Sequence, residues 1–219
     1  MPIRDAGRLD PRLLRLVVIS DGVGDLVRLE RLVTAAVDGG ARCVQLREPS
    51  WCARELFHAA ERLRPRLDAV GGILLVNDRV DVALLGAAHG VQIGQRSLPA
   101  ARVRRLLGPE PVIGFSAHGA DELELADAAG CDFALLSPVF PTSSKPGQPA
   151  LGVERAVAEA RRARLPIVWL GGIDTDTVRA VATLPAAARP AGVAVRSAIA
   201  DAAHPDVMAT TLLHGLGGA

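Results

Sequence analysis

The sequence contains no tyrosine, a single asparagine (Asn77) and, among 25 basic residues, a single lysine (Lys145). It also lacks a surplus of charge, because 24 acidic residues leave a formal net charge of +1. A chain without a positive surplus has little to attract a phosphate backbone, so we expect no nucleic-acid partner. Because arginine so dominates the basic residues, Lys145 is either a chance surface residue or a site that needs a compact ammonium group.

Cysteine and long apolar runs are also scarce. The three cysteines (Cys43, Cys52 and Cys131) form no CxxC pair and no metal-binding spacing, which is typical of a reducing compartment. Residues 1–15 contain no apolar signal-peptide core, and no uncharged apolar run reaches about 18 residues. We therefore expect a cytoplasmic protein with no membrane contact.

Short, continuous apolar runs alternate with longer amphipathic stretches along the whole chain. Such runs are typical of parallel strands that are buried on both faces. The predicted strands are 16–20, 43–46, 73–77, 90–93, 112–116, 133–137, 167–170 and 192–195. The predicted helices are 26–38, 51–68, 79–87, 98–107, 120–129, 152–163, 175–184 and 199–214.

Eight strand–helix units in 219 residues give about 27 residues per unit, which indicates a compact α/β fold of the single (β/α)8 TIM-barrel type. The alternative is a doubly wound open sheet, whose first turn is normally rich in glycine. The corresponding turn here, 20–25, has only a partial glycine pattern. No linker is apparent, so we expect one domain over 1–219, with 1–15 as an N-terminal extension.

In such a barrel the functional groups follow the carboxyl ends of the strands. Both singletons, Asn77 and Lys145, fall at this end. The glycine pair Gly171-Gly172 and the turn at Arg196-Ser197 match the usual barrel phosphate site, unless the glycines serve only a tight turn. The segment Thr142-Ser143-Ser144-Lys145 offers three hydroxyls and an ammonium group, which suit an anion or a polar surface loop.

Two further strand ends are followed by residues that could bind an anion or transfer a proton. Arg47 could clamp a phosphate or carboxylate in bidentate fashion, or pair with Glu48 or Asp78 at the barrel rim. His118 is the only histidine at a strand end, and Ser116 points to the same side of its strand. An imidazole exchanges protons near neutral pH, so His118 is either an acid–base group or a hydrogen-bonded rim histidine.

Seven segments, in order, resemble the family of thiamine-phosphate synthase and the TenI-type thiazole tautomerase. They are Val44–Glu48, Leu75–Ala83, Gly90–Gln95, Ile113–His118, Pro138–Thr142 with Lys145, Gly171–Ile173, and Gly192–Val195 with Ser197–Ile199. The resemblance implies a thiamine-pathway barrel that binds a phosphorylated thiazole. In the synthase, a pyrimidine pyrophosphate ionises with the help of Mg²⁺ and is captured by the thiazole nitrogen.

Carried over to this chain, the resemblance implies two groups of site residues. Gln45, Arg47, Asn77 and Lys145 would face the pyrophosphate, and Asp78 would bind Mg²⁺. The substrate and phosphate sites would be lined by Ser116, Thr142, Ser144, Gly172 and Ser197, together with Gly171 and Arg196 from the phosphate pattern above.

The chain departs from the synthase pattern at two positions. Pro49 stands where the synthase usually has a lysine, and Ser97 stands where it usually has a second acidic metal ligand. The tautomerase relatives share these departures and carry Gln at the position of Gln92. Their reaction moves a proton and needs no metal. In this chain His118 would move it.

These departures favour the tautomerase, an isomerase that aromatises a carboxylated thiazole phosphate, with His118 and Ser116 at the catalytic centre and no cofactor. The alternative is a synthase, a transferase that uses Mg²⁺, in which Arg96 partly replaces the missing lysine. A second alternative is a non-catalytic barrel that binds thiamine-type phosphates. The expected partner is a small phosphorylated thiazole, and a homodimer is left open by the sequence.

Overall fold

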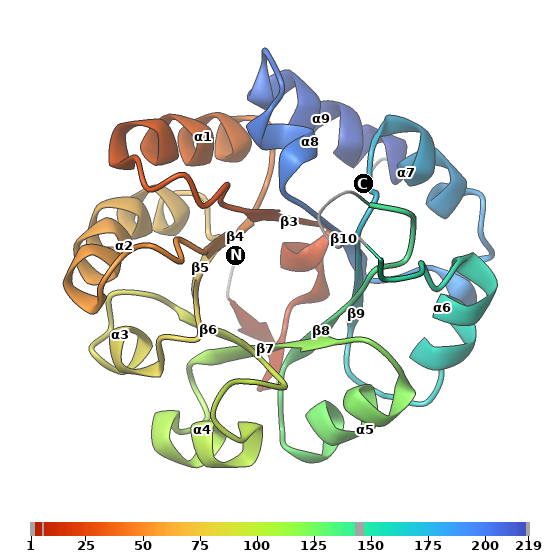
Figure 1. The fold of residues 1–219 in the computed structure, drawn as a ribbon, viewed down its shortest axis with the longest axis horizontal. Coiled ribbons are helices and arrows are strands. Elements are labelled where there is room, and N and C mark those ends of the chain that lie inside the picture. Colours follow the sequence, from red (N-terminus) through yellow and green to blue (C-terminus); the bar gives the residue numbers. More distant parts are fainter. Residues whose placement is uncertain (1–2, 6, 143–146, 218–219) are drawn as a thin grey trace.

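The computed structural model describes residues 3–5, 7–142 and 147–217. Eight parallel strands form a closed barrel in the order β10-β3-β4-β5-β6-β7-β8-β9 (Figure 1). They are β3 (Leu16–Ile19), β4 (Cys43–Leu46), β5 (Ile73–Asn77), β6 (Gly90–Gly94), β7 (Val112–Ala117), β8 (Phe133–Leu136), β9 (Ile167–Leu170) and β10 (Gly192–Val195). The (β/α)8 prediction is confirmed, and each predicted strand coincides with an observed strand to within one residue at either end.

The helices surround the barrel (Figure 1). They are α1 (Leu26–Asp38), α2 (Ala53–Asp68), α3 (Val80–Leu84), α4 (Ala100–Leu107), α5 (Ala120–Ala128), α6 (Val153–Ala160), α7 (Thr175–Ala182), α8 (Ser197–Ala200) and α9 (Pro205–Gly215), with a short 3₁₀ turn η2 (Ala186–Ala188). Apolar side chains fill the layer between strands and helices as well as the barrel interior. Burial on both faces explains why the strands read as continuous apolar runs.

The prediction of a single last helix over 199–214 is wrong. The chain forms the one-turn helix α8, leaves helical geometry, and begins α9 at Pro205. Proline disfavours helical geometry at the residue before it and has no N–H to donate, so it starts a helix instead of continuing one. The predicted helices 79–87 and 152–163 also extend three residues beyond the observed ends of α3 and α6.

The segment before β3 closes the amino end of the barrel. It consists of the antiparallel pair β1 (Arg4–Asp5) and β2 (Arg8–Leu9) and the 3₁₀ turn η1 (Pro11–Leu14). Leu13 and Leu14 are fully buried and pack with Cys43, Phe133 and other inward-facing residues of the strands. The N-terminal extension therefore contributes to the core of the barrel.

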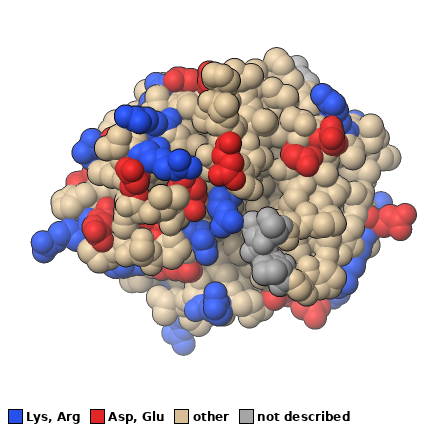
Figure 2. Space-filling view, turned by 45° about the horizontal axis from the view of Figure 1, so that its top comes forward, with Lys and Arg blue, Asp and Glu red and all other residues tan. Residues whose placement is uncertain are grey.

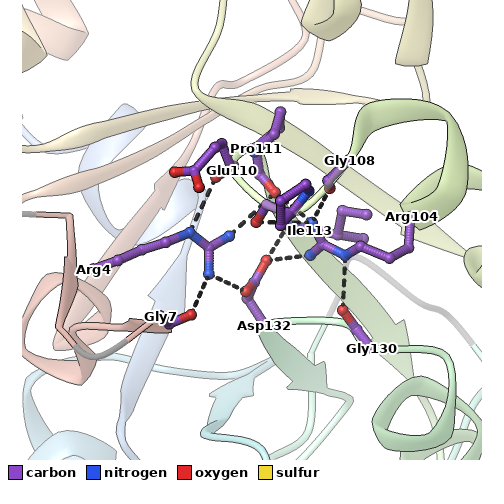
Figure 3. A network of polar contacts seen from close by, with 10 residues as sticks. Arg4, Gly7, Arg104, Gly108, Glu110, Pro111, Ile113, Gly130 and Asp132 are labelled. Atoms are coloured by element: carbon purple, nitrogen blue, oxygen red, sulfur yellow. Dashed lines mark hydrogen bonds and ion pairs between the residues drawn. The ribbon is translucent and has the colours of Figure 1, made fainter.

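A charged network fastens this segment to the barrel (Figure 3). Asp132 accepts hydrogen bonds from Arg4 Nη1 (2.7 Å), Arg104 Nη2 (2.6 Å) and the backbone N–H of Ile113 (2.7 Å). The two guanidinium groups also donate to backbone carbonyls of the N-terminal turn and of the loops that precede β7 and β8. The three charged side chains are only 10–19% exposed, so the network is mostly shielded from water.

Candidate active site

A cavity of about 710 Å³ opens at the carboxyl end of the barrel and is lined by residues from all eight strands or the loops that follow them. It brings together all the predicted site residues that the structure describes: Gln45, Arg47, Asn77, Asp78, Ser116, His118, Thr142, Gly171, Gly172, Arg196 and Ser197. The predicted residues Ser144 and Lys145 lie outside the described part of the chain. The floor is partly apolar, with Ile19, Leu135 and Ala194 among its residues.

A relay of hydrogen bonds crosses three strand ends on one side of the cavity. The Gln45 amide donates to Asn77 Oδ1 (2.8 Å), and the Asn77 amide donates to Asp78 Oδ2 (2.8 Å). Asp78 Oδ1 accepts from the Ser97 hydroxyl, whose oxygen accepts from the backbone N–H of Gly94 (2.8 Å). Asp78 has a φ of 59°, an uncommon conformation for a residue with a side chain. Both of its carboxylate oxygens are thus held in place.

The end of β7 supplies two polar groups. Ser116 Oγ accepts a hydrogen bond from the Gln92 amide (3.0 Å). His118 Nδ1 lies 3.2 Å from Glu122 Oε2, which also accepts from the His118 backbone N–H (2.9 Å). A carboxylate only accepts hydrogen bonds, so this contact places a proton on Nδ1. In neutral His118 the basic nitrogen is then Nε2.

The turn after β9 packs directly on the loop after β8. Gly172 has a φ of 64°, and a Cβ atom there would lie 2.4 Å from the carbonyl oxygen of Pro141. The backbone N–H of Phe140 donates to the carbonyl of Gly171 (3.1 Å), and Thr177 Oγ1 donates to that of Gly172 (3.0 Å). Only glycine combines this conformation with so close an approach, so the pair does more than reverse the chain.

Positive charge lines the cavity from two sides. Arg47 follows β4, Arg96 follows β6, and Arg196 follows β10 on the other side. Figure 2 shows basic side chains at the border of the hollow near the centre of this face, with acidic side chains close by. Within the described part of the chain, neither Arg47 nor Arg96 forms an ion pair, whereas Asp78, Glu122 and His118 all have polar partners. The predicted alternative, a rim salt bridge of Arg47, is therefore absent from these residues.

The neighbouring residue Glu48 is occupied elsewhere. Its buried carboxylate accepts from the backbone N–H groups of Gly22 (3.3 Å) and Gly24 (2.8 Å). Ser20 Oγ accepts from the backbone N–H of Arg47 (2.8 Å). These contacts fix the loop between β3 and α1 against the end of β4, and so fix the backbone that carries Arg47.

The described residues contain no group of three or more His, Cys, Asp or Glu side chains that could enclose a metal ion. Two carboxylates line the cavity, Asp78 and Glu122, and Glu122 is bound to His118. Mg²⁺ in phosphate-transfer sites is commonly held by one or two carboxylates, with substrate phosphates and water completing its shell. Asp78 with the adjacent Ser97 hydroxyl fits such an ion if the substrate supplies the other oxygens.

The buried cysteines do not contribute to this chemistry. Burial raises the pKa of the Cys43 thiol and raises that of Cys131 to about 12. Neither thiol is ionised near neutral pH, so neither can act as a nucleophile. This agrees with the absence of a useful cysteine spacing in the sequence.

Sequence reasoning missed Glu122 and Gln148, and it did not place Gln92 behind Ser116. The spacing of His118 and Glu122 was a usable signal, because an acidic residue in the first turn of a helix can reach back to the residues that precede the helix. Gln148 carries no comparable signal, since it follows the loop after β8.

Comparison with known proteins agrees with this architecture. Residues 16–199 match the family described as "Thiamine monophosphate synthase". The chain belongs to the thiamine-phosphate synthase/TenI family. It is 42% identical over 204 residues to the thiamine-phosphate synthase of Laribacter hongkongensis, with 93% of this chain and 94% of the relative covered. The thiamine-phosphate synthase of Vibrio parahaemolyticus is 36% identical over 200 residues, with 91% and 96% covered.

A solved structure of this family has the same fold. The thiamine phosphate pyrophosphorylase from Pyrococcus furiosus superposes with a TM-score of 0.82 at 28% identity, with 94% of this chain and 96% of that chain covered. The names of these relatives support an enzyme and agree with the synthase alternative. They do not support the tautomerase that the sequence departures favoured. No helix in the described ranges is both long and apolar enough to cross a membrane.

Proposed function

We propose that this protein is a thiamine-phosphate synthase, a transferase that joins hydroxymethylpyrimidine pyrophosphate to a thiazole phosphate and releases pyrophosphate. The observation that carries this proposal is Asp78, a carboxylate fixed on both oxygens at the edge of an arginine-lined cavity. A metal-free site for a carboxylated thiazole phosphate has no use for it, because it would repel the substrate's own anions. A site for Mg²⁺ and pyrophosphate requires it.

Two sides of the cavity would hold the two anions. Arg47, with the amides of Gln45 and Asn77 beside it, would bind the pyrophosphate at the ends of β4 and β5. Arg196, Ser197 and the turn at Gly171-Gly172 would bind the phosphate of the thiazole after β9 and β10. This arrangement supports a reaction in which two phosphorylated rings are brought together between the anion sites.

The remaining residues would orient the rings. Ile19, Leu135 and Ala194 provide an apolar floor that excludes water from a reactive pyrimidine cation. Ser116 and Thr142 lie at the cavity wall, where their hydroxyls can bond polar ring atoms. Buried Gln45 Oε1 has no hydrogen-bond partner within the described ranges, so it is available to a donor on the substrate.

Asp78 would hold Mg²⁺, with the Ser97 hydroxyl fixing the carboxylate. When bound, the ion would offset the negative charge that develops on the departing pyrophosphate. The protein groups that share this charge are Arg47 and Arg96. Ser144 and Lys145 were predicted to join this site but lie outside the described residues.

Tautomerase chemistry is the second candidate, and the contact between His118 and Glu122 favours it. A carboxylate that accepts the Nδ1 proton of a cavity-lining histidine favours the tautomer in which Nε2 is the basic nitrogen, and a proton-transfer reaction needs a basic nitrogen. Transfer of the pyrimidine group to the thiazole nitrogen does not require His118 to accept a proton from the thiazole. The two functions therefore depend on different residues.

Matched variants separate them. A synthase should release pyrophosphate from the two substrates with Mg²⁺, and Asp78→Asn should reduce this rate by about 100-fold, the cost of one lost electrostatic contact in the transition state. His118→Gln should reduce it far less. If the protein is a tautomerase, His118→Gln should reduce turnover of the carboxylated thiazole phosphate far more than Asp78→Asn does. If the folded protein binds thiamine phosphate but turns over neither substrate set, the non-catalytic alternative replaces both.

A further inference from the structure

The charged side chains that line the cavity are unfavourable for a free divalent cation. Its described lining includes three arginines, Arg47, Arg96 and Arg196, and two carboxylates, Asp78 and Glu122. Glu122 is bound to His118. Asp78, which lies beside the Asn77 amide and the Ser97 hydroxyl, is therefore the one carboxylate of the described lining that could bind the cation. A free cation would therefore meet a wall with more positive than negative charge.

Asp78 is exposed, yet both of its carboxylate oxygens accept hydrogen bonds from neighbouring side chains. The Ser97 hydroxyl has one proton, and because its oxygen accepts from the Gly94 N–H, that proton is directed to Asp78 Oδ1. Asn77 holds the other oxygen, and Gln45 holds Asn77. The left-handed backbone of Asp78 is fixed by a hydrogen bond from its N–H to the carbonyl of Gln92 (2.9 Å). Ser97 is thus a positioning residue for this carboxylate.

We infer that this protein does not bind its divalent cation on its own, and that cation and pyrophosphate enter the site as one unit. One carboxylate, together with repulsion from Arg47 and Arg96, gives a site too weak for the free ion. Pyrophosphate reverses the balance, since its charge is attracted by the arginines and its oxygens supply the missing ligands. Each partner then raises the affinity of the protein for the other, as linkage requires.

Ser97 sets this dependence. A carboxylate at position 97 would stand next to Asp78 and give the cation a second charged ligand without pyrophosphate. The hydroxyl orients Asp78 without adding negative charge. The choice of serine therefore makes cation binding conditional on the anion.

This inference rests on the proposed function for its ligand, but its test requires no turnover. Mn²⁺, a substitute for Mg²⁺ that is visible by paramagnetic resonance, is titrated into the protein with and without inorganic pyrophosphate. Samples of Mn²⁺ and pyrophosphate without protein correct for the complex that forms in solution. Calorimetry measures pyrophosphate binding with and without Mn²⁺, with the same correction.

The wild-type protein is expected to bind Mn²⁺ at least about tenfold more tightly when pyrophosphate is present, and Mn²⁺ should raise the affinity for pyrophosphate by the same factor. Ser97→Asp should bind Mn²⁺ without pyrophosphate and lose most of this coupling. Ser97→Ala should keep the coupling but bind the Mn²⁺–pyrophosphate pair about tenfold more weakly, through loss of a charge-assisted hydrogen bond. It also provides the test if Ser97→Asp does not fold.

A paired substitution tests the role of charge. Arg96→Gln should weaken pyrophosphate binding without metal, whereas Arg105→Gln, on the exposed surface of α4 and outside the cavity lining, should not. Equal Mn²⁺ affinity of the wild type with and without pyrophosphate would overturn the inference, even if the protein proves to be a synthase. Conversely, if Mn²⁺ and pyrophosphate bind cooperatively but no thiamine phosphate is formed, the inference holds and the proposed function is wrong.

Discussion

Replacing Asp132 by asparagine tests how firmly the N-terminal segment is joined to the barrel. Asp132 is the only acidic partner of Arg4 and Arg104 within the described residues, and the three side chains are 10–19% exposed. Asparagine has nearly the same shape but leaves two shielded guanidinium groups without a counter-charge. Removal of one partner from a buried ion pair typically costs about 3–5 kcal/mol.

The lower end of that range applies here. Arg4 and Arg104 keep their hydrogen bonds to backbone carbonyls, and the side-chain carbonyl of the introduced asparagine can still accept one hydrogen bond. We therefore expect a loss of about 3 kcal/mol in the free energy of unfolding. For a chain of this length, that corresponds to a decrease in Tm of about 6–12 °C.

An exposed ion pair serves as the control for the size of this stability loss. Asp127 pairs with Arg164 at 3.4 Å, but Arg164 is 95% exposed, so Asp127→Asn should change stability by less than about 1 kcal/mol. Both variants are compared with the wild type by urea and thermal unfolding. Equal losses of stability in the two variants would show that the Asp132 network does not stabilise the fold more than an exposed ion pair does. Because the network lies at the amino end of the barrel, KM at a temperature where Asp132→Asn is folded should not change.

The same unfolding curves test the domain organisation. We propose that the chain forms one domain, with the N-terminal extension as part of its core, because Leu13 and Leu14 are buried inside the barrel. A single domain of this kind should unfold in one cooperative transition that coincides for different probes. Two separated transitions would contradict it.

Two further predictions concern the turn at β9 and a histidine at the other end of the barrel. Gly172→Ala places a Cβ atom 2.4 Å from the Pro141 carbonyl oxygen in a left-handed conformation, so the turn must move. A residue with a side chain costs about 1–2 kcal/mol in this conformation, and a loss of that size in binding should raise the KM for the thiazole phosphate about tenfold in steady-state assays. An unchanged KM would show that this turn is not part of the phosphate site. His89 accepts from the Leu74 N–H (3.0 Å) and contacts Asp68 (2.7 Å), and burial lowers its pKa below the ordinary 6.5. The contribution of neutral His89 to stability is therefore fully present above pH 6.5 and decreases below it, because the unfolded chain takes up the proton first. The wild type should lose more stability than His89→Gln between about pH 7.5 and about pH 5.5. Equal losses in the two proteins would contradict this assignment.

The sequence was sufficient to predict the barrel and most of the polar side chains that line the cavity, but not its apolar residues. Parallel strands buried on both faces leave continuous apolar runs, and the fold itself places whatever follows those runs at one end. This is why residues as distant as Arg47 and Arg196 could be assigned to one site. The short strands β1 and β2 leave no such pattern, and the contact of Arg4 with Asp132 spans 128 residues, so neither was predictable.

The choice of reaction could not be made from the sequence alone. Pro49 in place of a lysine and Ser97 in place of a second acidic metal ligand favour the tautomerase when residue types alone are compared. The structure shows that Ser97 still serves Asp78 through a hydrogen bond, a role that a comparison of residue types does not reveal. The relatives' names then support the synthase. The cytoplasmic location and the homodimer stay predictions.

The proposed synthase activity is tested by incubating the wild-type protein with both substrates, once with Mg²⁺ and once with a chelator in its place. Thiamine phosphate and pyrophosphate are then measured in the same samples. We expect the two products to appear in equal amounts and only with Mg²⁺, and we expect Asp78→Asn to lower both about 100-fold. Aromatisation of a carboxylated thiazole phosphate by the same preparation, with no pyrophosphate released from the synthase substrates, would contradict the proposed activity.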